Sequence, residues 1–230
     1  MTSTDTVLMY HHLGLGDHFI CNGLVRYALQ ELQPRRMYIP TKIHNFPTVS
    51  MMYSDDQRIV CIPIETDADV SILPELNDKI GLIVVGFEKC RLKDWDVSFY
   101  DSVGISFDIR WNYFKVNRNP IREILLESFL DIKDGEKFIL VHEDGSSGNF
   151  PIQIKTDLRV VKVKKHSDSL MDWCGVIEKA EEVHCIDSSF IHVAQMMNVK
   201  TGVFHNNRPS TGCFVLRSSW SFRDYNNNNQ

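Results

Sequence analysis

The stretch from residue 7 to residue 32 constrains the fold most, because its hydrophobic period changes from that of a strand to that of a helix across a glycine turn. Residues 7–11 form a short apolar run bounded by polar residues, as in a buried strand. After Gly14 and Gly16, apolar side chains recur at helical spacing to the end of the stretch. In an open α/β sheet, the loop between such a strand and helix lies at the carboxyl edge, where ligands bind. Asp17 lies at the mouth of this predicted loop.

Two interpretations of the loop are open at this point. Glycines let a ligand or another backbone approach closely, which favours a binding loop with Asp17 as its functional group. The alternative is purely structural, with Gly14 and Gly16 serving a tight connection and Asp17 capping the helix that follows.

Strand and helix patterns alternate through the rest of the first half. Short strands are predicted at 37–40 and 58–64, and helical pieces at 43–53 and 95–103. The run 79–87 is continuously apolar, as expected for a strand covered on both faces. This alternation predicts an α/β fold with a mostly parallel sheet.

A helix with clear boundary signals opens the second half. Asn119 is a suitable N-cap, Pro120 fits the first helical position, and Gly135 lies just past the expected end. Four apolar residues fall on one face of this helix: Ile121, Ile124, Leu125 and Phe129.

The remaining residues predict a second α/β unit. Its expected strands are 137–142, 160–164, 182–186 and 201–205, and its expected helices lie near 169–180 and 189–198. We therefore divide the chain into a first half (1–112), a linker and helix (113–135), a second half (136–225) and a polar tail (226–230), which is predicted to be disordered.

The sharpest signal for a ligand lies where the predicted strand 182–186 ends. Asp187, Ser188 and Ser189 follow it directly and open an apolar helical pattern. Free backbone N–H groups at a helix start favour an anion, and serine hydroxyls add donors without blocking its approach. An ordinary N-cap role for Asp187 and Ser188 is the structural alternative.

A second polar loop, 142–149, follows the first strand of this half. It holds two glycines and two serines, including Ser146, Ser147 and Gly148, and such a loop suits a phosphate bound by backbone donors at a helix start. Histidines end three predicted strands, at His11, His142 and His205, which favours one shared cleft.

Composition excludes several classes of function. The net charge of −5 lacks the basic excess of a nucleic-acid surface. The amino terminus has no basic and apolar leader pattern, and no apolar run is long enough to cross a bilayer, so we expect a cytoplasmic protein. The six cysteines form no C-x-x-C pair, which favours free thiols over disulfides or a structural zinc.

Two of these segments resemble a known family. Leu13-Gly14-Leu15-Gly16-Asp17 opening a helix, together with 186–194 (Ile-Asp-Ser-Ser-Phe-Ile-His-Val-Ala), looks like the two signatures of the heptosyltransferase-like glycosyltransferases (glycosyltransferase family 9) of the GT-B fold. The resemblance implies two Rossmann-like halves facing across a cleft, with an acceptor side in the first and a nucleotide-sugar site in the second. The chain is much shorter than typical members, and the usual Lys-x-Trp segment after the phosphate loop is absent.

The resemblance also implies roles for individual residues. Asp17 becomes the general base of an inverting, metal-independent transfer from a nucleotide-sugar donor to a glycan or glycolipid acceptor, with no further cofactor. The implied donor contacts are Asp187, Ser188, Ser189 and His192. From the two glycine loops we also expect substrate or nucleotide-sugar contacts at Gly14, Gly16, His18, His142, Ser146, Ser147 and Gly148. The departing diphosphate needs fixed donors or a cation, for which Lys155, Arg159 and Arg208 are candidates.

Three alternatives remain. A metal-dependent GT-A-type glycosyltransferase would use an Asp-x-Asp pair, either Asp67 with Asp69 or Asp94 with Asp96. A dinucleotide-dependent oxidoreductase would need a third glycine where Phe19 stands. A non-catalytic nucleotide-sugar-binding module would present the same loops without base chemistry.

Overall fold

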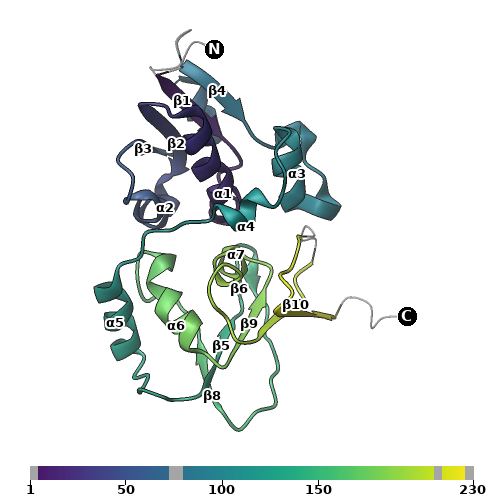
Figure 1. Ribbon diagram of the computed structural model, residues 1–230. Helices are drawn as coiled ribbons and strands as arrows, with labels where there is room; N and C mark the ends of the chain where they lie inside the picture. The colour runs from purple at the N-terminus through teal and green to yellow at the C-terminus, as the bar shows by residue number, and fades with distance from the viewer. Residues whose placement is uncertain (1–4, 73–79, 210–213, 226–230) are drawn as a thin grey trace. The chain divides into compact units, whose positions relative to one another are not determined.

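The computed structural model describes residues 5–72, 80–209 and 214–225 (Figure 1). Contacts between residues divide the chain into two compact units. The first comprises Met1–Asn117 with Gly212–Val215, and the second Arg118–Thr211 with Leu216–Gln230. The predicted tail, 226–230, lies outside the described residues.

The first unit is built on a parallel sheet of the order β3-β2-β1-β4. Its strands are β1 (Thr6–Tyr10), β2 (Arg36–Lys42), β3 (Ile59–Ile64) and β4 (Ile80–Val84), and its helices are α1 (Leu15–Leu32), α2 (Phe46–Tyr53), α3 (Trp95–Ser102) and α4 (Ile109–Asn112). Helix α1 packs closely on α4 at Gly23, where a Cβ would lie 2.5 Å from the Ile109 carbonyl oxygen. The strand-to-helix switch predicted for residues 7–32 is confirmed as β1 and α1.

Strand β4 differs from its prediction. It pairs only with β1 among the described strands, and Leu82 and Val84 are 56% and 45% exposed. The expectation of a strand covered on both faces was wrong. A continuous apolar run does not report whether helices cover the strand, since its side chains alternate between two faces.

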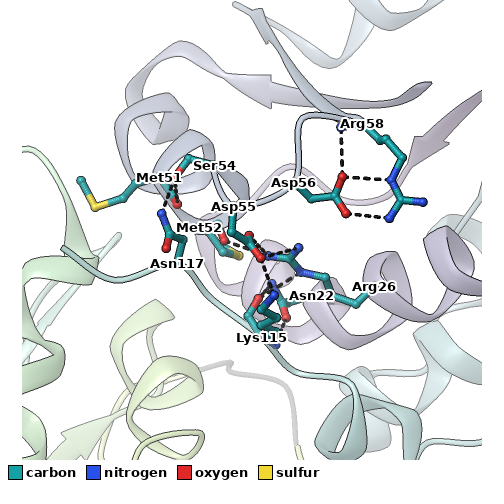
Figure 2. A network of polar contacts seen from close by, with 10 residues as sticks. All are labelled: Asn22, Arg26, Met51, Met52, Ser54, Asp55, Asp56, Arg58, Lys115 and Asn117. Atoms are coloured by element: carbon teal, nitrogen blue, oxygen red, sulfur yellow. Dashed lines mark hydrogen bonds and ion pairs between the residues drawn. The ribbon is translucent and has the colours of Figure 1, made fainter. Parts of the chain in front are cut away.

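A polar network fixes the segment that follows α4 (Figure 2). Arg26 on α1 donates from Nη2 to Asp55 Oδ1 at 2.6 Å and to the Met52 carbonyl at 3.1 Å. Asn22, one turn earlier, bonds both backbone groups of Lys115: its Oδ1 accepts from the N–H at 2.8 Å, and its Nδ2 donates to the carbonyl at 3.1 Å. One face of α1 therefore holds the chain as it leaves the first unit.

The second unit is built on a parallel sheet of the order β11-β10-β9-β5-β8. Its strands are β5 (Phe138–His142), β8 (Arg159–Lys162), β9 (Glu182–Ile186), β10 (Gly202–Asn206) and β11 (Trp220–Asp224); a hairpin, β6 (Asp144–Gly145) with β7 (Gly148–Asn149), follows β5. Its helices are α5 (Pro120–Phe129), α6 (Cys174–Lys179) and α7 (Ser189–Ala194). Two mostly parallel sheets confirm the α/β fold class, although β11 was not predicted.

The two faces of this sheet are covered differently. Ile139, Val141 and Ile186 pack with Ile152 of the long connection between β7 and β8, so we call this side the loop face. The opposite side is the helix face, where His142 stacks on Phe190 of α7 with ring centroids 4.7 Å apart. Side chains alternate along each strand, and every residue is therefore assigned to one face by its register.

Helix α5 exposes most of its apolar residues and buries a charged one, which is the reverse of an ordinary amphipathic helix. Asn119 caps it as predicted, accepting from the Arg122 N–H at 3.2 Å, but the helix ends at Phe129, before Gly135. Its buried residues are Glu123 and Leu126. The apolar residues Ile121, Ile124, Leu125 and Phe129 are 59 to 71% exposed.

Ion pairs explain why α5 turns the face with Glu123, and not its apolar face, toward the rest of the second unit. Arg122 bonds Asp172 at 2.8 Å, and Glu123 accepts from Arg118 at 2.6 Å. Close approach to α6 is possible at Gly175, where a Cβ would lie 2.6 Å from a Glu127 oxygen.

None of the helices in the described ranges is long and apolar enough to cross a membrane.

Candidate functional site

Arg208 joins two of the loops that the sequence singled out in the second unit. It follows β10, and its Nη2 donates to Ser146 Oγ at 2.8 Å and its Nε to Ser147 Oγ at 3.2 Å. Its Nη1 donates to the Asp187 carbonyl at 2.8 Å. One guanidinium, from the chain after β10, therefore contacts both the loop after β5 and the loop after β9. We call these contacts of Arg208 with Ser146, Ser147 and the Asp187 carbonyl the Arg208 edge. The carboxyl ends of these adjacent parallel strands form the edge where α/β sheets bind ligands.

Ser188 and His142 extend this edge. Ser188 is the N-cap of α7, its Oγ accepting from the Phe190 N–H at 3.3 Å. The same Oγ lies 3.2 Å from His142 Nδ1. Burial lowers the pKa of His142 to about 4, so the ring is neutral at pH 7. The neutral ring carries one hydrogen, and its Nδ1 pairs with the Ser188 hydroxyl, a group that can donate or accept.

The loop 142–149 is not a helix start, contrary to the prediction. Its residues form the hairpin of β6 and β7, with Ser146 and Ser147 exposed at the turn. Gly148 has φ of 142°, a conformation that L side chains rarely adopt. Glycine and serine thus serve a tight turn that presents two hydroxyls to Arg208.

In the first unit, Asp17 lies in the first turn of α1, which begins at Leu15 rather than after Asp17. Its Oδ1 accepts from the Trp95 indole N–H at 3.1 Å. A Cβ on Gly14 would lie 2.7 Å from Asp17 Oδ2, so the carboxylate leans over the glycine. A negative charge is favourable here because helix N-termini carry a partial positive charge.

The Trp95 ring that bonds Asp17 belongs to a cluster of packed aromatic rings. Trp95 packs against His12, with ring centroids 5.1 Å apart, and His12 stacks on Phe87 and Phe99 at 4.5 and 5.5 Å. His12 Nε2 accepts from the Phe87 N–H at 3.0 Å. No local pattern predicts the contact between Trp95 and Asp17, because the two residues are 78 apart along the chain.

Other predicted contacts lie inside the units. His18 is fully buried and meets His11 edge-on, with ring centroids 4.5 Å apart. Gly16 is the second residue of α1, and His192 on α7 is 6% exposed. The His18 and His192 side chains are therefore buried, whereas Gly16 and Ser188 are half-buried and Ser146 and Ser147 are exposed.

The strand-end histidines do not share one cleft. His11 lies in the first unit and is fully buried. His142 is in register with Cys185, and His205 with Ile186. Cys185 and Ile186 are consecutive on β9 and point to opposite sides, so His142 and His205 lie on opposite faces of the second sheet.

The three candidate cations are separated by their contacts. Arg159 donates to the Leu130 carbonyl at 2.5 Å and to Glu136 at 3.1 Å, which engages it at the start of β8. Lys155 lines a cavity on the loop face. Only Arg208, among these three, contacts the predicted donor loops.

The Asp-x-Asp pairs are engaged by other groups. Asp67 pairs with Lys42 at 3.1 Å, while Asp69 accepts from the Thr66 N–H at 2.8 Å. Asp96 is buried in an ion pair with Arg110. Asp94 is likewise held by Arg91 at 2.8 Å. Within the described ranges, no group of three or more His, Cys, Asp or Glu side chains is placed to hold a metal ion.

Comparison with known proteins identifies the fold. No family model matches the sequence, and no curated protein matches it. The crystal structure of the glycosyl transferase family 9 from Veillonella parvula DSM 2008 superposes with a TM-score of 0.63 at 9% identity, covering 97% of this chain and 88% of that chain. The E. coli ADP-heptose LPS heptosyltransferase II superposes with a TM-score of 0.61 at 11% identity, covering 95% and 90%. The resemblance stated from the sequence is confirmed at the level of the fold.

Proposed function

We propose that this protein is an inverting glycosyltransferase that transfers a sugar from a nucleotide-sugar donor to a glycan or glycolipid. Two lines of observation support the proposal. The fold is that of glycosyltransferases of known structure over nearly the whole chain. Arg208 and the hydroxyls it gathers form a cationic, donor-rich edge in the second unit. The Arg208 contacts carry the proposal, because they supply what a diphosphate needs.

In the proposed reaction, the acceptor hydroxyl oxygen forms a bond to the anomeric carbon while the bond to the nucleotide breaks. The electron pair of that bond goes to the diphosphate, and the acceptor proton goes to the Asp17 carboxylate. Arg208 and the Ser146 hydroxyl stabilise the charge that develops on the diphosphate, as preorganised donors do in transition states. The Trp95 indole holds the Asp17 carboxylate in one orientation for proton transfer.

Neutral His142 fits the donor side of this scheme. It adds no charge at pH 7 beside the Arg208 contacts, and its Nδ1 pairs with the Ser188 hydroxyl at 3.2 Å. A metal-dependent reaction through an Asp-x-Asp pair is less favoured, because both pairs already bind cations or backbone N–H groups. A non-catalytic module would share the Arg208 edge but would not depend on Asp17.

Binding of nucleoside diphosphates tests the donor site. We expect isothermal titration calorimetry with UDP, ADP, GDP and CDP to find one that binds, and Arg208→Gln to weaken it at least tenfold. The double variant Ser188→Leu, Ser189→Leu should also weaken nucleotide binding, because the larger side chains fill the space through which the diphosphate reaches the Arg208 edge. Lys165→Gln removes an exposed charge elsewhere in the same unit and is the control. Equal affinity for Arg208→Gln and Lys165→Gln would refute the donor assignment.

A further inference from the structure

The loop face of the second sheet carries a cavity that the proposed transfer does not use. Its volume is about 970 Å³. One part of its lining is apolar, formed by Ile139 and Val141 of β5 with Ile152 and Ile154 of the connection above them. The His142 and Ser188 pair lies on the opposite, helix face. The cavity is therefore separate from the Arg208 edge.

A hydrogen-bonded chain of four side chains crosses the other part of this face. Tyr225 Oη lies 2.9 Å from His205 Nδ1, and His205 Nε2 lies 2.9 Å from His184 Nδ1. His184 Nε2 lies 2.9 Å from Glu182 Oε2. Both histidines are buried, at 0 and 1% exposure, while Glu182, His184 and Tyr225 line the cavity.

The direction of every hydrogen bond in this chain is fixed. An ionised Glu182 only accepts, so His184 carries its hydrogen on Nε2 and presents a lone pair at Nδ1. His205 then donates from Nε2, and its Nδ1 accepts from the Tyr225 hydroxyl. Burial lowers the pKa of both rings, that of His205 to about 4, so the chain is uncharged between Glu182 and Tyr225. The Tyr225 oxygen and the Glu182 carboxylate thus offer only acceptors to the cavity.

Cations supply the donors. Lys162 pairs with Glu143 at 2.7 Å. Lys155 and Arg223 also line the cavity, and neither side chain has a hydrogen bond or ion pair to another described residue. Arg223 is in register with His205, four residues beyond Glu182 along the strand direction, or about 13 Å at the usual rise. Arg223 is thus separated from Glu182, the one carboxylate among the described residues that line the cavity.

We propose that this cavity binds a small organic acid with an apolar body. The acid group pairs with Arg223 beside the Tyr225 end, and the apolar body lies against Ile139, Val141 and Ile152. Charge favours an anion because Lys155 and Arg223 outnumber Glu182 in the lining, while Lys162 is neutralised by Glu143. An arginine binds a carboxylate through two parallel hydrogen bonds, which gives this end its specificity. The site is independent of the proposed transfer, since no residue is shared with the Arg208 edge.

Titration of the full chain with octanoate, observed by NMR, tests the proposal. We expect saturable binding that shifts the His205 and Tyr225 ring signals, and at least tenfold weaker binding by Arg223→Gln and by Ile152→Asn. Octanamide, which has the same body without the charge, should bind at least tenfold more weakly than octanoate. Lys165→Gln, which removes an exposed positive charge outside the cavity, should leave the affinity unchanged.

Three results would overturn it. These are no saturable binding of octanoate, equal binding of the amide and the acid, or the same affinity in Arg223→Gln and Lys165→Gln. Circular dichroism of each variant shows whether the fold is retained. If Ile152→Asn fails to fold, the comparison of Arg223→Gln with Lys165→Gln decides the question, because Arg223 is exposed on an edge strand.

Discussion

Gly14 shows how a single residue links the fold to the proposed chemistry. Its φ of −67° and ψ of 146° are open to any amino acid, so the turn itself does not require glycine. What excludes a side chain is the Asp17 carboxylate, 2.7 Å from the position of a Cβ. The glycine is therefore needed for the placement of the carboxylate.

Replacing Gly14 by alanine should displace Asp17 with little cost to the fold. We expect transfer to fall at least tenfold in Gly14→Ala, while the free energy of unfolding in urea changes by less than about 1 kcal/mol. In a double variant with Asp17→Asn, the alanine should add no further loss, because the two changes act through one group. Independent, multiplicative losses would show that Gly14 acts in another way.

At the residue scale, the sequence identified loops better than partners. Asp17 and Ser188 emerged as candidates because glycines and hydroxyls after apolar runs have local signatures, whereas Arg208 was one of three candidate cations among which the sequence did not decide. Trp95 did not, since its contact with Asp17 joins residues 78 apart in the chain. His18 was expected at the loop surface, but helical geometry turns its side chain into the core.

Helix α5 illustrates what periodicity predicts and what it does not. Its N-cap and first residue were predicted, but its apolar stripe is exposed and its charged side faces the unit. The hydrophobic period identifies a helix whichever way the helix faces. Arg122 and Glu123 find partners from other segments, Asp172 and Arg118, and no local pattern reveals these.

The orientation of α5 predicts opposite results for two neighbouring positions. Leu126→Ala should lower the free energy of unfolding by about 2 to 4 kcal/mol, because Leu126 is 5% exposed. Ile124→Ala should lower it by less than about 1 kcal/mol, because Ile124 is 59% exposed. Urea unfolding of both variants measures the difference. A larger loss for Ile124→Ala would mean that the apolar stripe is covered in solution.

For the whole molecule, the alternation of strands and helices was enough to predict two parallel α/β sheets. It did not reveal β11, whose residues place Trp220 against Gly202, or the long connection that covers the loop face without a helix. Both depend on packing between distant segments. The polar chain from Glu182 to Tyr225 was missed for the same reason, since it joins β9, β10 and the residue that follows β11.

Buried neutral histidines predict how stability depends on pH. Burial lowers the pKa of His11 and of His142 to about 4, well below the value near 6.5 expected in the unfolded chain. Between these values the unfolded state binds more protons, so stability must fall as pH drops from about 6.5 to about 4. Each ring contributes a loss of about 2 kcal/mol by pH 5.

Urea unfolding at pH 7 and pH 5 measures this loss. Most paired carboxylates act at lower pH, so the histidines dominate this interval. His142→Gln should reduce the difference between the two pH values, whereas the exposed His44→Gln should leave it unchanged. A protein that is as stable at pH 5 as at pH 7 would contradict the assignment of these rings as neutral.

The measurement that tests the proposed function most directly compares the wild-type protein with Asp17→Asn. Both proteins are incubated with a nucleotide sugar that contains the nucleoside diphosphate found to bind, and with a glycolipid extract as acceptor. The released nucleoside diphosphate is then quantified. We predict release by the wild-type protein, at least a hundredfold less by Asp17→Asn, and equal affinity of the two for the nucleoside diphosphate. Undiminished release by Asp17→Asn, or no nucleotide binding by the wild-type protein, would contradict the account.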